Sequence, residues 1–332
     1  MHLKTYLRLL FPFVFAIFSL TALSGCHKSA GRNTVIKDIN KIVYVSGTFD
    51  STKAPNDRRA VYWKDGQQFT LPIKLNTTDY RLAGDVWAMT AIGKDIYIGG
   101  TNYDHAGYWK NGIFNSLNVG NGLTVRDMVN DGTNVYTTMN TGNGYLCYKN
   151  TQLLGKGGPS IAVDGGNVYV LALVNMMPFL QVNNVITTAV SSELAIAETI
   201  AVSNGDVYIA GEGYNGTGAR LVVKLLKNNK LIYSATDNSG VFSMAISGKD
   251  IYMVGSVTQG YPSVALWKNG VQTIIEPNAN ARAITIDGND VYLAGAKNAT
   301  DGTYQACYWK NGVIKILNTH NSVAKGVVII NK

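Results

Sequence analysis

Apolar and polar residues alternate in short stretches along most of the chain, and small turn sequences separate these stretches. The commonest stretch passes from an apolar strand through a two-residue turn into Val-Tyr or Ile-Tyr, often with a Gly soon after. Alternation with a period of two predicts half-buried β-strands, and Gly or Asn in the turns predicts tight hairpins. The phrase occurs at Tyr44, Tyr97, Tyr136, Tyr169, Tyr208, Tyr252 and Tyr292.

A second phrase follows each of the first, and it consists of an aromatic or apolar residue before Lys-Asn-Gly. The two phrases alternate seven times, at a spacing of about forty residues, which is typical of four-stranded propeller blades. We therefore predict an all-β fold, a seven-bladed β-propeller of four-stranded antiparallel blades over residues 35–332. The second phrase is clear at Trp63, Trp109, Trp267 and Trp309, shortened at Tyr148, and degraded at Val182-Asn183-Asn184 and Leu226-Lys227-Asn228.

The last strand of the chain indicates how the ring closes. Residues 324–331 align with residues 281–288, so they form a first strand without the second strand that normally follows it. The repeat around residues 41–47 has a second strand but only a poor first strand. The C-terminal strand is therefore predicted to pair into the first blade, which removes two open sheet edges. An array of β-sandwiches, the alternative all-β arrangement, does not explain this split blade.

Each repeat orders its four strands in the same way. Tight turns join the first strand to the second and the third to the fourth, so all tight turns are expected on one face of the ring. The longer connections then lie on the opposite face, here called the loop face. With phrases such as Tyr97-Ile98-Gly99-Gly100, the repeat over residues 35–332 loosely resembles kelch-type β-propeller proteins.

The first residues have the features of an export signal. Lys4 and Arg8 precede an apolar run over residues 9–18 that is too short to span a membrane. The sequence Leu23-Ser24-Gly25-Cys26 then resembles the lipobox of bacterial lipoproteins. The resemblance implies a signal peptide over residues 1–25, lipidation of Cys26, a lipidated tether over residues 26–34, and a membrane as partner through the lipid anchor. The alternative is an ordinary signal peptide with a chance Cys.

Composition and charge narrow the function only slightly. Charged residues make up 15% of the chain, and the net charge is +8. No run of Lys and Arg is interleaved with aromatic residues, so no nucleic acid partner is expected. The histidines show no metal-ligand spacing and the chain has no Gly-rich phosphate loop, so the sequence predicts no metal, no cofactor and no catalytic residue. Cys147 and Cys307 each precede a Tyr in what reads as the same repeat position, which predicts two free, buried thiols.

The candidate ligand-binding residues are those that break the repeat. Ten positions before each blade Tyr, at the loop-face start of the first strand, the residue type changes from blade to blade, whereas two positions later it is always apolar and is expected to serve packing. The mixed set suits a ligand at a central mouth, and the alternative is an unconstrained rim. Its members are Trp87, Arg126, Pro159, Glu198, Phe242 and Arg282, with Lys325 in the same place in the C-terminal strand. Loop residues expected on the same face are Tyr103, His105, Tyr145, Tyr214, Tyr261 and Tyr304.

Three functions fit this arrangement. The first is a membrane-anchored binding or scaffold propeller of the bacterial cell envelope, expected at the outer membrane with the leaflet open, that recognises a glycan, a peptide or a partner protein through its loop face. The second is a propeller-type carbohydrate-active enzyme, a glycosidase or lyase, which needs carboxylates converging at the mouth. Only Glu198 is acidic at the ring positions, with Asp127 one residue beyond Arg126. The third is a structural subunit of an envelope assembly.

Replacing Cys26 with Ala should release the protein from membranes without unfolding it, because the predicted lipid is attached outside the propeller and several acyl chains on one cysteine are needed for stable anchoring. Fractionation of cells, followed by a thermal melt of the released protein, measures both effects. Recovery of the variant in the membrane pellet would refute the anchor.

Overall fold

The computed structural model describes residues 40–50, 58–72, 84–102, 105–117, 124–216 and 220–332. Contacts divide the chain into two units, residues 1–34 and residues 35–332, and every described residue belongs to the second unit. The predicted lipidation site, Cys26, lies outside the described residues. Within the described ranges all regular elements are β-strands, and no helix is long and apolar enough to cross a membrane.

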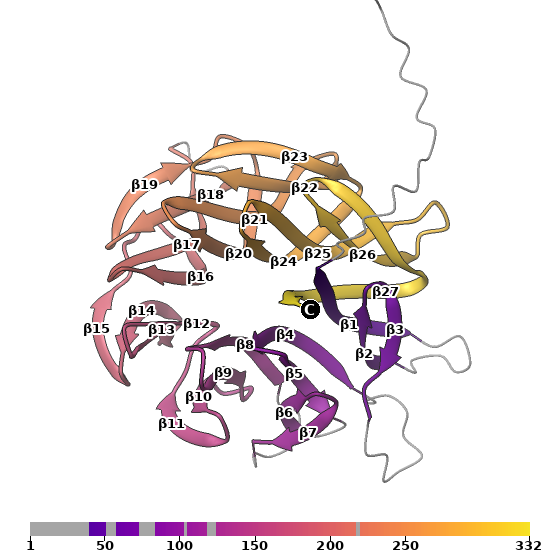
Figure 1. Ribbon diagram of the computed structural model, residues 1–332. Coiled ribbons are helices and arrows are strands. Elements are labelled where there is room, and N and C mark those ends of the chain that lie inside the picture. Colours follow the sequence, from indigo (N-terminus) through magenta and orange to yellow (C-terminus); the bar gives the residue numbers. More distant parts are fainter. Residues whose placement is uncertain (1–39, 51–57, 73–83, 103–104, 118–123, 217–219) are drawn as a thin grey trace, which may run out of the picture. The chain divides into compact units, whose positions relative to one another are not determined.

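Five antiparallel sheets of four strands each form propeller blades arranged around a centre (Figure 1). The first strand of each blade is innermost and the last is at the rim. In chain order the blades are β4 (Asp85–Ile92), β5 (Asp95–Asn102), β6 (His105–Lys110) and β7 (Ile113–Ser116); β8 (Thr124–Asn130), β9 (Val135–Asn140), β10 (Tyr145–Lys149) and β11 (Gln152–Lys156); β12 (Ser160–Asp164), β13 (Asn167–Val174), β14 (Met177–Val182) and β15 (Val185–Ala189); β16 (Ile196–Ser203), β17 (Asp206–Tyr214), β18 (Leu221–Lys227) and β19 (Lys230–Ser234); and β20 (Ser239–Ser247), β21 (Asp250–Gln259), β22 (Tyr261–Lys268) and β23 (Val271–Pro277).

The remaining strands form one sheet of seven, which differs from the expected seven separate blades. Strand β27 (Val313–Asn331) is 19 residues long, and this length lets it pair with two strands. Its first half pairs with β26 (Tyr304–Lys310) and its second half pairs with β1 (Lys41–Asp50). The prediction of seven separate four-stranded sheets is therefore corrected to five such blades and one shared sheet. In spatial order this sheet contains β24 (Ala279–Asp287), β25 (Asp290–Asn298), β26 (Tyr304–Lys310), β27 (Val313–Asn331), β1 (Lys41–Asp50), β2 (Arg58–Lys64) and β3 (Gln67–Thr70).

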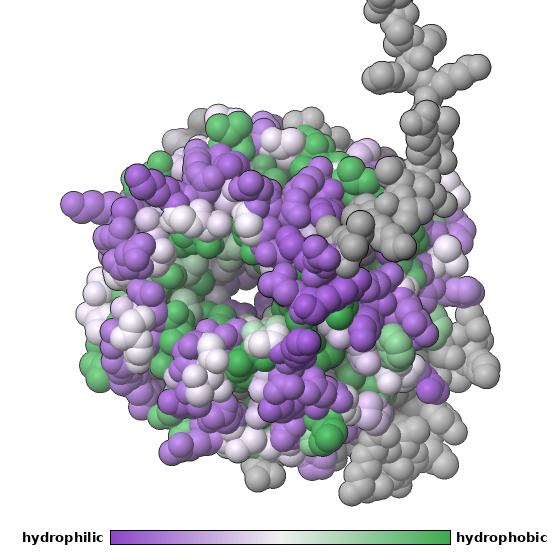
Figure 2. Space-filling model, in the orientation of Figure 1, coloured by the Kyte–Doolittle hydropathy of each residue, from purple (hydrophilic) through white to green (hydrophobic). Residues whose placement is uncertain are grey.

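The innermost strands surround a central opening, which the space-filling view shows as a gap in the ring (Figure 2). Each of these strands contacts the next one around the centre, and the last contacts the first. The C-terminal strand β27 thus lies between β24 and β4, where it pairs with β1 from Lys41↔Asn331 to Phe49↔Ser322. The strands of this inner cycle are β4, β8, β12, β16, β20, β24 and β27.

The Asn of the Lys-Asn-Gly phrase links the two tight turns of a blade by hydrogen bonds. In the β4–β7 blade, Asn111 has a φ of 49°, accepts a hydrogen bond from the Ile96 amide at 2.9 Å and donates to Asp95 at 2.7 Å. Asn tolerates the left-handed region and its side chain both donates and accepts, so one residue makes its own turn and ties it to the neighbouring turn. Lys110 lies over the ring of Tyr97 and pairs with Asp95 at 2.9 Å. Equivalent asparagine contacts occur at Asn150, Asn183, Asn228, Asn269 and Asn311.

The tryptophans of the repeat pack between blades. All four have no exposed surface, and Trp267 contacts residues of the preceding blade, including Tyr208 and Val223. Large buried aromatic side chains account for much of the apolar area between neighbouring blades. The four are Trp63, Trp109, Trp267 and Trp309.

The repeat is weakest between the β8–β11 and β12–β15 blades. Tyr169 pairs with Val182, where other blades pair the Tyr with the Lys of the phrase. Val182 therefore occupies the Lys position and the preceding Gln181 the Trp position, which corrects the alignment of this relic by one residue. Gln181 is buried and donates to the Lys156 carbonyl at 2.8 Å. Gln181 takes the Trp place and Cys147 takes a place that holds Tyr or Leu in the other blades, and both line a cavity of about 330 Å³ between these two blades.

Cys147 and Cys307 are free and buried, as predicted. Burial raises the pKa of the Cys147 thiol to about 12 and also raises the pKa of Cys307. The two residues do not share a repeat position, because Cys147 pairs with Thr138 and Cys307 with Gly295, which are two and three residues after their blade Tyr. Adjacent positions of a strand face opposite sides of the sheet, so the two thiols contact different neighbouring blades.

Deleting residues 323–332 should reduce solubility or lower the melting temperature by roughly 10 °C or more. The deletion removes the β1 pairing partner and takes Ala324 and Val327 out of a core cluster that contains Val43 and Trp63. Thermal unfolding of the deletion variant measures the effect, and deletion of Lys332 alone is the control. Near-native melting of the longer deletion would show that this strand is not needed to hold the ring.

Candidate functional site

A β-bulge near the loop-face end of the inner strand sets the direction of most candidate side chains. In β4, Val86 pairs with Gly100 and Ala88 pairs with Gly99, so Trp87 has no partner on β5. An extra residue of this kind bends the strand and changes where its side chain points. The same register shift occurs in six inner strands, and the extra residues, here called the bulge residues, are Trp87, Arg126, Glu198, Phe242, Arg282 and Lys325.

The recurring Gly of the repeat allows the backbone to come close at the bulge. A Cβ on Gly100 would lie 2.0 Å from the Asp85 carbonyl oxygen, and one on Gly295 would lie 1.9 Å from that of Asn280. No side chain can be accommodated at such distances without moving the inner strand. Equivalent close approaches occur at Gly47, Gly211 and Gly255, so five of the six bulges lie opposite a glycine, and the bulge at Arg126 lies opposite Met139.

The bulge residues meet in a central pocket of about 450 Å³. All six line it, together with Pro159, which precedes β12 and takes the corresponding place without a bulge. The structure therefore brings together every ring residue that the repeat singled out. The apolar positions two residues later were expected to serve packing alone, but they also line this pocket: Met89, Met128, Ile161, Ile200, Met244, Ile284 and Val327.

Lys325 is held at the pocket wall by a carboxylate and an aromatic face. Its ammonium lies 2.6 Å from Asp85 and 3.8 Å from the centroid of the Trp87 ring. Burial lowers the pKa of Lys325, and Asp85 opposes this effect. Arg58 also lines the pocket, at 3.3 Å from Asp50 and 4.0 Å from Asp85. The charges of Lys325 and Arg58 are therefore largely balanced by these two aspartates.

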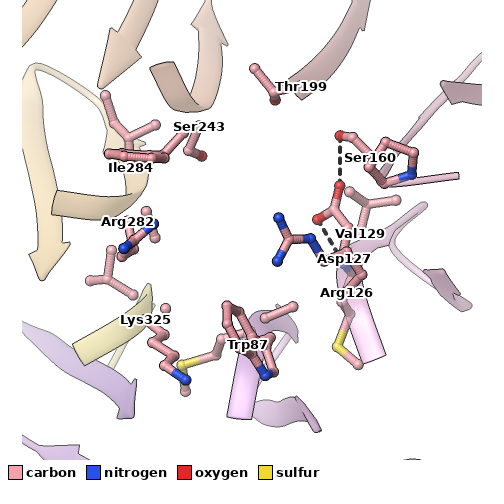
Figure 3. A pocket seen from close by; sticks show the side chains of 18 of the residues that line it. Trp87, Arg126, Asp127, Val129, Ser160, Thr199, Ser243, Arg282, Ile284 and Lys325 are labelled. Carbon is pink, nitrogen blue, oxygen red and sulfur yellow. Dashed lines mark hydrogen bonds between the residues drawn. The ribbon is translucent and has the colours of Figure 1, made fainter. Parts of the chain in front are cut away.

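Arg126 and Arg282 are held differently, because each lies against an aromatic ring and not against a carboxylate. The Arg126 guanidinium lies 5.3 Å from the centroid of Trp87, and that of Arg282 lies 4.4 Å from Phe242. Among the described residues, neither guanidinium has an ion pair or hydrogen bond with an acidic group. The two side chains enter the pocket from opposite walls (Figure 3). Burial and then the charge of Arg126 lower the pKa of Arg282, and the charge of Glu198 opposes this effect.

A buried network fixes the Arg126 wall of the pocket. Asp127 accepts hydrogen bonds from Ser160 Oγ at 2.7 Å, the Ile161 amide at 3.0 Å and the Met128 amide at 2.8 Å (Figure 3). Ser160 Oγ accepts in turn from the Ile200 amide at 3.2 Å. Burial raises the pKa of Asp127, and these hydrogen bonds oppose the increase. The network joins three inner strands, so both Asp127 oxygens are used within the protein.

Two further carboxyl groups lie near the pocket. Burial raises the pKa of Glu198, while Arg126 and Arg282 lower it, and Glu198 has no hydrogen bond or ion pair to a described residue. Burial, with the charge of Glu198, raises the pKa of Glu212 to about 7. Glu212 Oε1 accepts from the Val241 amide at 3.0 Å and does not line the pocket. Of these groups, Glu198 alone presents an unengaged carboxyl to the described pocket wall.

The loop residues expected at the same site stand apart from it. None of the described members lines the pocket. Tyr214 and Tyr261 are 58% and 74% exposed, and Tyr304 is 44% exposed, so these three face solvent. His105 begins β6 and Tyr145 begins β10. Tyr103 lies outside the described residues.

Sequence reasoning did not select Asp85, Ser160 or Glu212. Asp85 and Ser160 act through contacts with other blades, which no local pattern reveals. Glu212 had a signal, because it lies four residues after the blade Tyr, where the other six repeats have no charged residue. No group of three or more His, Cys, Asp or Glu side chains that could hold a metal ion occurs in the described part of the chain.

No family model matches the chain, and no curated protein matches it. Among solved structures it is similar to a puromycin-hydrolyzing peptidase of Mycobacterium tuberculosis, with 12% identity, a TM-score of 0.51, and coverage of 82% of this chain and 53% of that one. The β-propeller domain of the Trilobed protease from Pyrococcus furiosus matches at 10% identity and TM-score 0.45 over 86% of this chain and 94% of that domain. An extracellular domain from B. thetaiotaomicron matches at 16% identity and TM-score 0.43 over 75% of this chain.

The chain spans about half of the peptidase and 36% of the B. thetaiotaomicron domain. At these identities the likeness concerns the fold alone. That fold is an all-β propeller of four-stranded antiparallel blades.

The Glu212→Gln variant should become more stable relative to the parent protein as the pH rises from 4.5 to 7. The parent carboxyl stays neutral in the folded state up to a pKa of about 7, against 4.5 when unfolded, so its stabilising contribution is complete below 4.5 and is lost as the pH rises through 7. Gln does not titrate and keeps the acceptor for the Val241 amide. The gain should reach about 2 kcal/mol, since part of the group faces solvent.

Thermal melts of both proteins across this pH range measure the difference, in which the contributions of acids that do not interact with Glu212 cancel. Parallel curves for the two proteins would contradict the raised pKa of Glu212.

Proposed function

We propose that the chain is a binding or scaffold propeller whose ligand enters the central pocket. The observation that carries this proposal is the set of six bulges, which place cationic, acidic and aromatic side chains around one pocket of about 450 Å³. A volume of this size suits a small ligand or the end of a larger one. The ligand is a glycan, a peptide or a segment of a partner protein.

The seven-stranded sheet is best counted as two blades that share β27, which gives a ring of seven. The supporting contacts are the cycle of seven inner strands and the pairing of β27 with β26 at one end and β1 at the other. In this view the C-terminal strand closes the ring by completing the first blade. A closed ring leaves no unpaired inner edge and keeps the bulge residues in fixed mutual positions.

The lipobox-like sequence that ends at Cys26 supports attachment to a membrane of the bacterial cell envelope. A membrane-attached propeller would present its central pocket at a fixed site of the envelope, which suits capture of a ligand or partner. The release expected for Cys26→Ala tests this part of the proposal separately from ligand binding.

The alternative function is a glycosidase or lyase, and Glu198 is the observation in its favour. A half-buried carboxyl with a raised pKa in a pocket is the kind of group that serves as a general acid. Glycosidases of the usual kind need a second carboxyl facing the same bond. In the described pocket Asp127 is fully hydrogen-bonded and Glu212 does not line the wall, so binding without turnover is the function that the geometry supports better.

Arrays of glycans and peptides probed with the purified chain test the proposal. Phe242→Ala, which alters the pocket wall, should weaken any specific signal at least tenfold, and Tyr261→Ala, which alters an exposed loop tyrosine, should leave it unchanged. Equal losses in the two variants, or no specific signal on either array, would overturn binding at the pocket. Cleavage of a bound glycan that Glu198→Gln abolishes would establish the enzyme instead.

A further inference from the structure

We infer that the central pocket recognises a carboxylate-bearing sugar, with Arg126 and Arg282 binding the carboxylate from opposite walls. This inference rests on the proposed function and narrows it to one class of ligand. It depends on which cations of the pocket are already neutralised, which donors remain, and what else the wall offers.

The cations of the pocket fall into two groups. Lys325 and Arg58 lie within 4.0 Å of aspartate oxygens, so their charge is balanced inside the protein. Arg126 and Arg282 have no such partner among the described residues, and Glu198 is the one acidic side chain of the wall with a carboxyl that no described residue engages. The unbalanced charge of the pocket is therefore positive and is centred on two guanidiniums.

The aromatic contacts orient these guanidiniums without using their hydrogen-bond donors. Arg126 lies over the Trp87 ring and Arg282 over the Phe242 ring, and neither guanidinium donates a hydrogen bond to a described residue. The donors of a guanidinium lie in its plane, in a fork that matches the two oxygens of a carboxylate. Because both groups are positioned before a ligand arrives, little side-chain entropy is lost when an anion binds.

The neighbouring side chains suit a sugar as the carrier of the carboxylate. Thr199 and Ser243 directly follow two bulge residues and line the pocket, and their hydroxyl groups make no hydrogen bond to a described residue. Figure 3 shows both on the wall across from Trp87. Free hydroxyls beside two guanidiniums match a ligand that has several hydroxyls and one carboxylate, which is the chemistry of a hexuronate. A purely acidic peptide would not use them.

Titration calorimetry of the purified chain with D-glucuronate or short uronate oligosaccharides, glucose, and the neutral methyl ester of glucuronate tests the inference. Glucuronate or its oligosaccharides should bind at least tenfold more tightly than the two neutral sugars. Arg126→Gln and Arg282→Gln should each weaken uronate binding at least tenfold, whereas Arg220→Gln, at an exposed position outside the pocket, should have no effect. Thermal melts check that each variant is folded, and the comparison of acid with ester needs no variant.

Equal affinity for glucuronate and its methyl ester would overturn carboxylate recognition. Binding that is confined to an Asp- and Glu-rich peptide, or to inorganic sulfate or phosphate, would overturn the sugar. If the pocket instead binds a neutral glycan on the array and Phe242→Ala removes that signal, the inference fails while the proposed binding function stands. No binding to any of these probes, and no signal on either array, would remove both.

Discussion

The close approach of two backbones at five of the six bulges is the constraint on which the centre of this propeller depends. At these five bulges the neighbouring strand has a glycine, as at Gly100 and Gly295, whereas Met139 lies opposite the bulge at Arg126. The extra residue has no partner on the neighbouring strand, so its side chain points into the pocket and does not pack against the sheet. Most of the repeated Gly positions of the sequence therefore reflect the geometry of the pocket wall as well as that of the turns.

Charged side chains are paired at the tight turns of the blades and only partly paired in the central pocket. At the tight turns, Lys and Asp of the same blade pair with each other and the Lys lies over the blade Tyr, as with Lys110, Asp95 and Tyr97. These contacts are exposed, so each adds little stability. Because they recur in several blades, the tight turns of these blades have the same arrangement of Lys, Asp and Tyr. At the centre the pairing is incomplete, and Arg126 and Arg282 keep their charge facing the pocket. The difference between paired and unpaired cations, more than net charge, distinguishes the two regions.

Much of this arrangement could be read from the repeat. Alternation and turn residues predicted the strands, and comparison of equivalent positions picked out Trp87, Arg126 and Arg282, which the structure places in one pocket. The same comparison shifted the alignment of one strand by one residue. From the sequence, Val182 aligns with the Trp of the other repeats. Val182 pairs with Tyr169, which is the pairing of the Lys position, so Gln181 occupies the Trp position. A degraded repeat offers too few matching residues to set its own register, whereas hydrogen-bonded pairing sets it without ambiguity.

The sequence by itself determined the order of the strands, the four-stranded unit, and which positions differ between blades, because these depend on local periodicity and turn chemistry. Tertiary structure alone decided how blades join and which polar groups meet. The long strand β27 merges two expected sheets into one, since a single extended strand can pair along both halves of its length. Asp85 reaches Lys325, and Asp127 reaches Ser160, across gaps of 240 and 33 residues. Contacts at such separations arise from ring geometry, which no local pattern encodes.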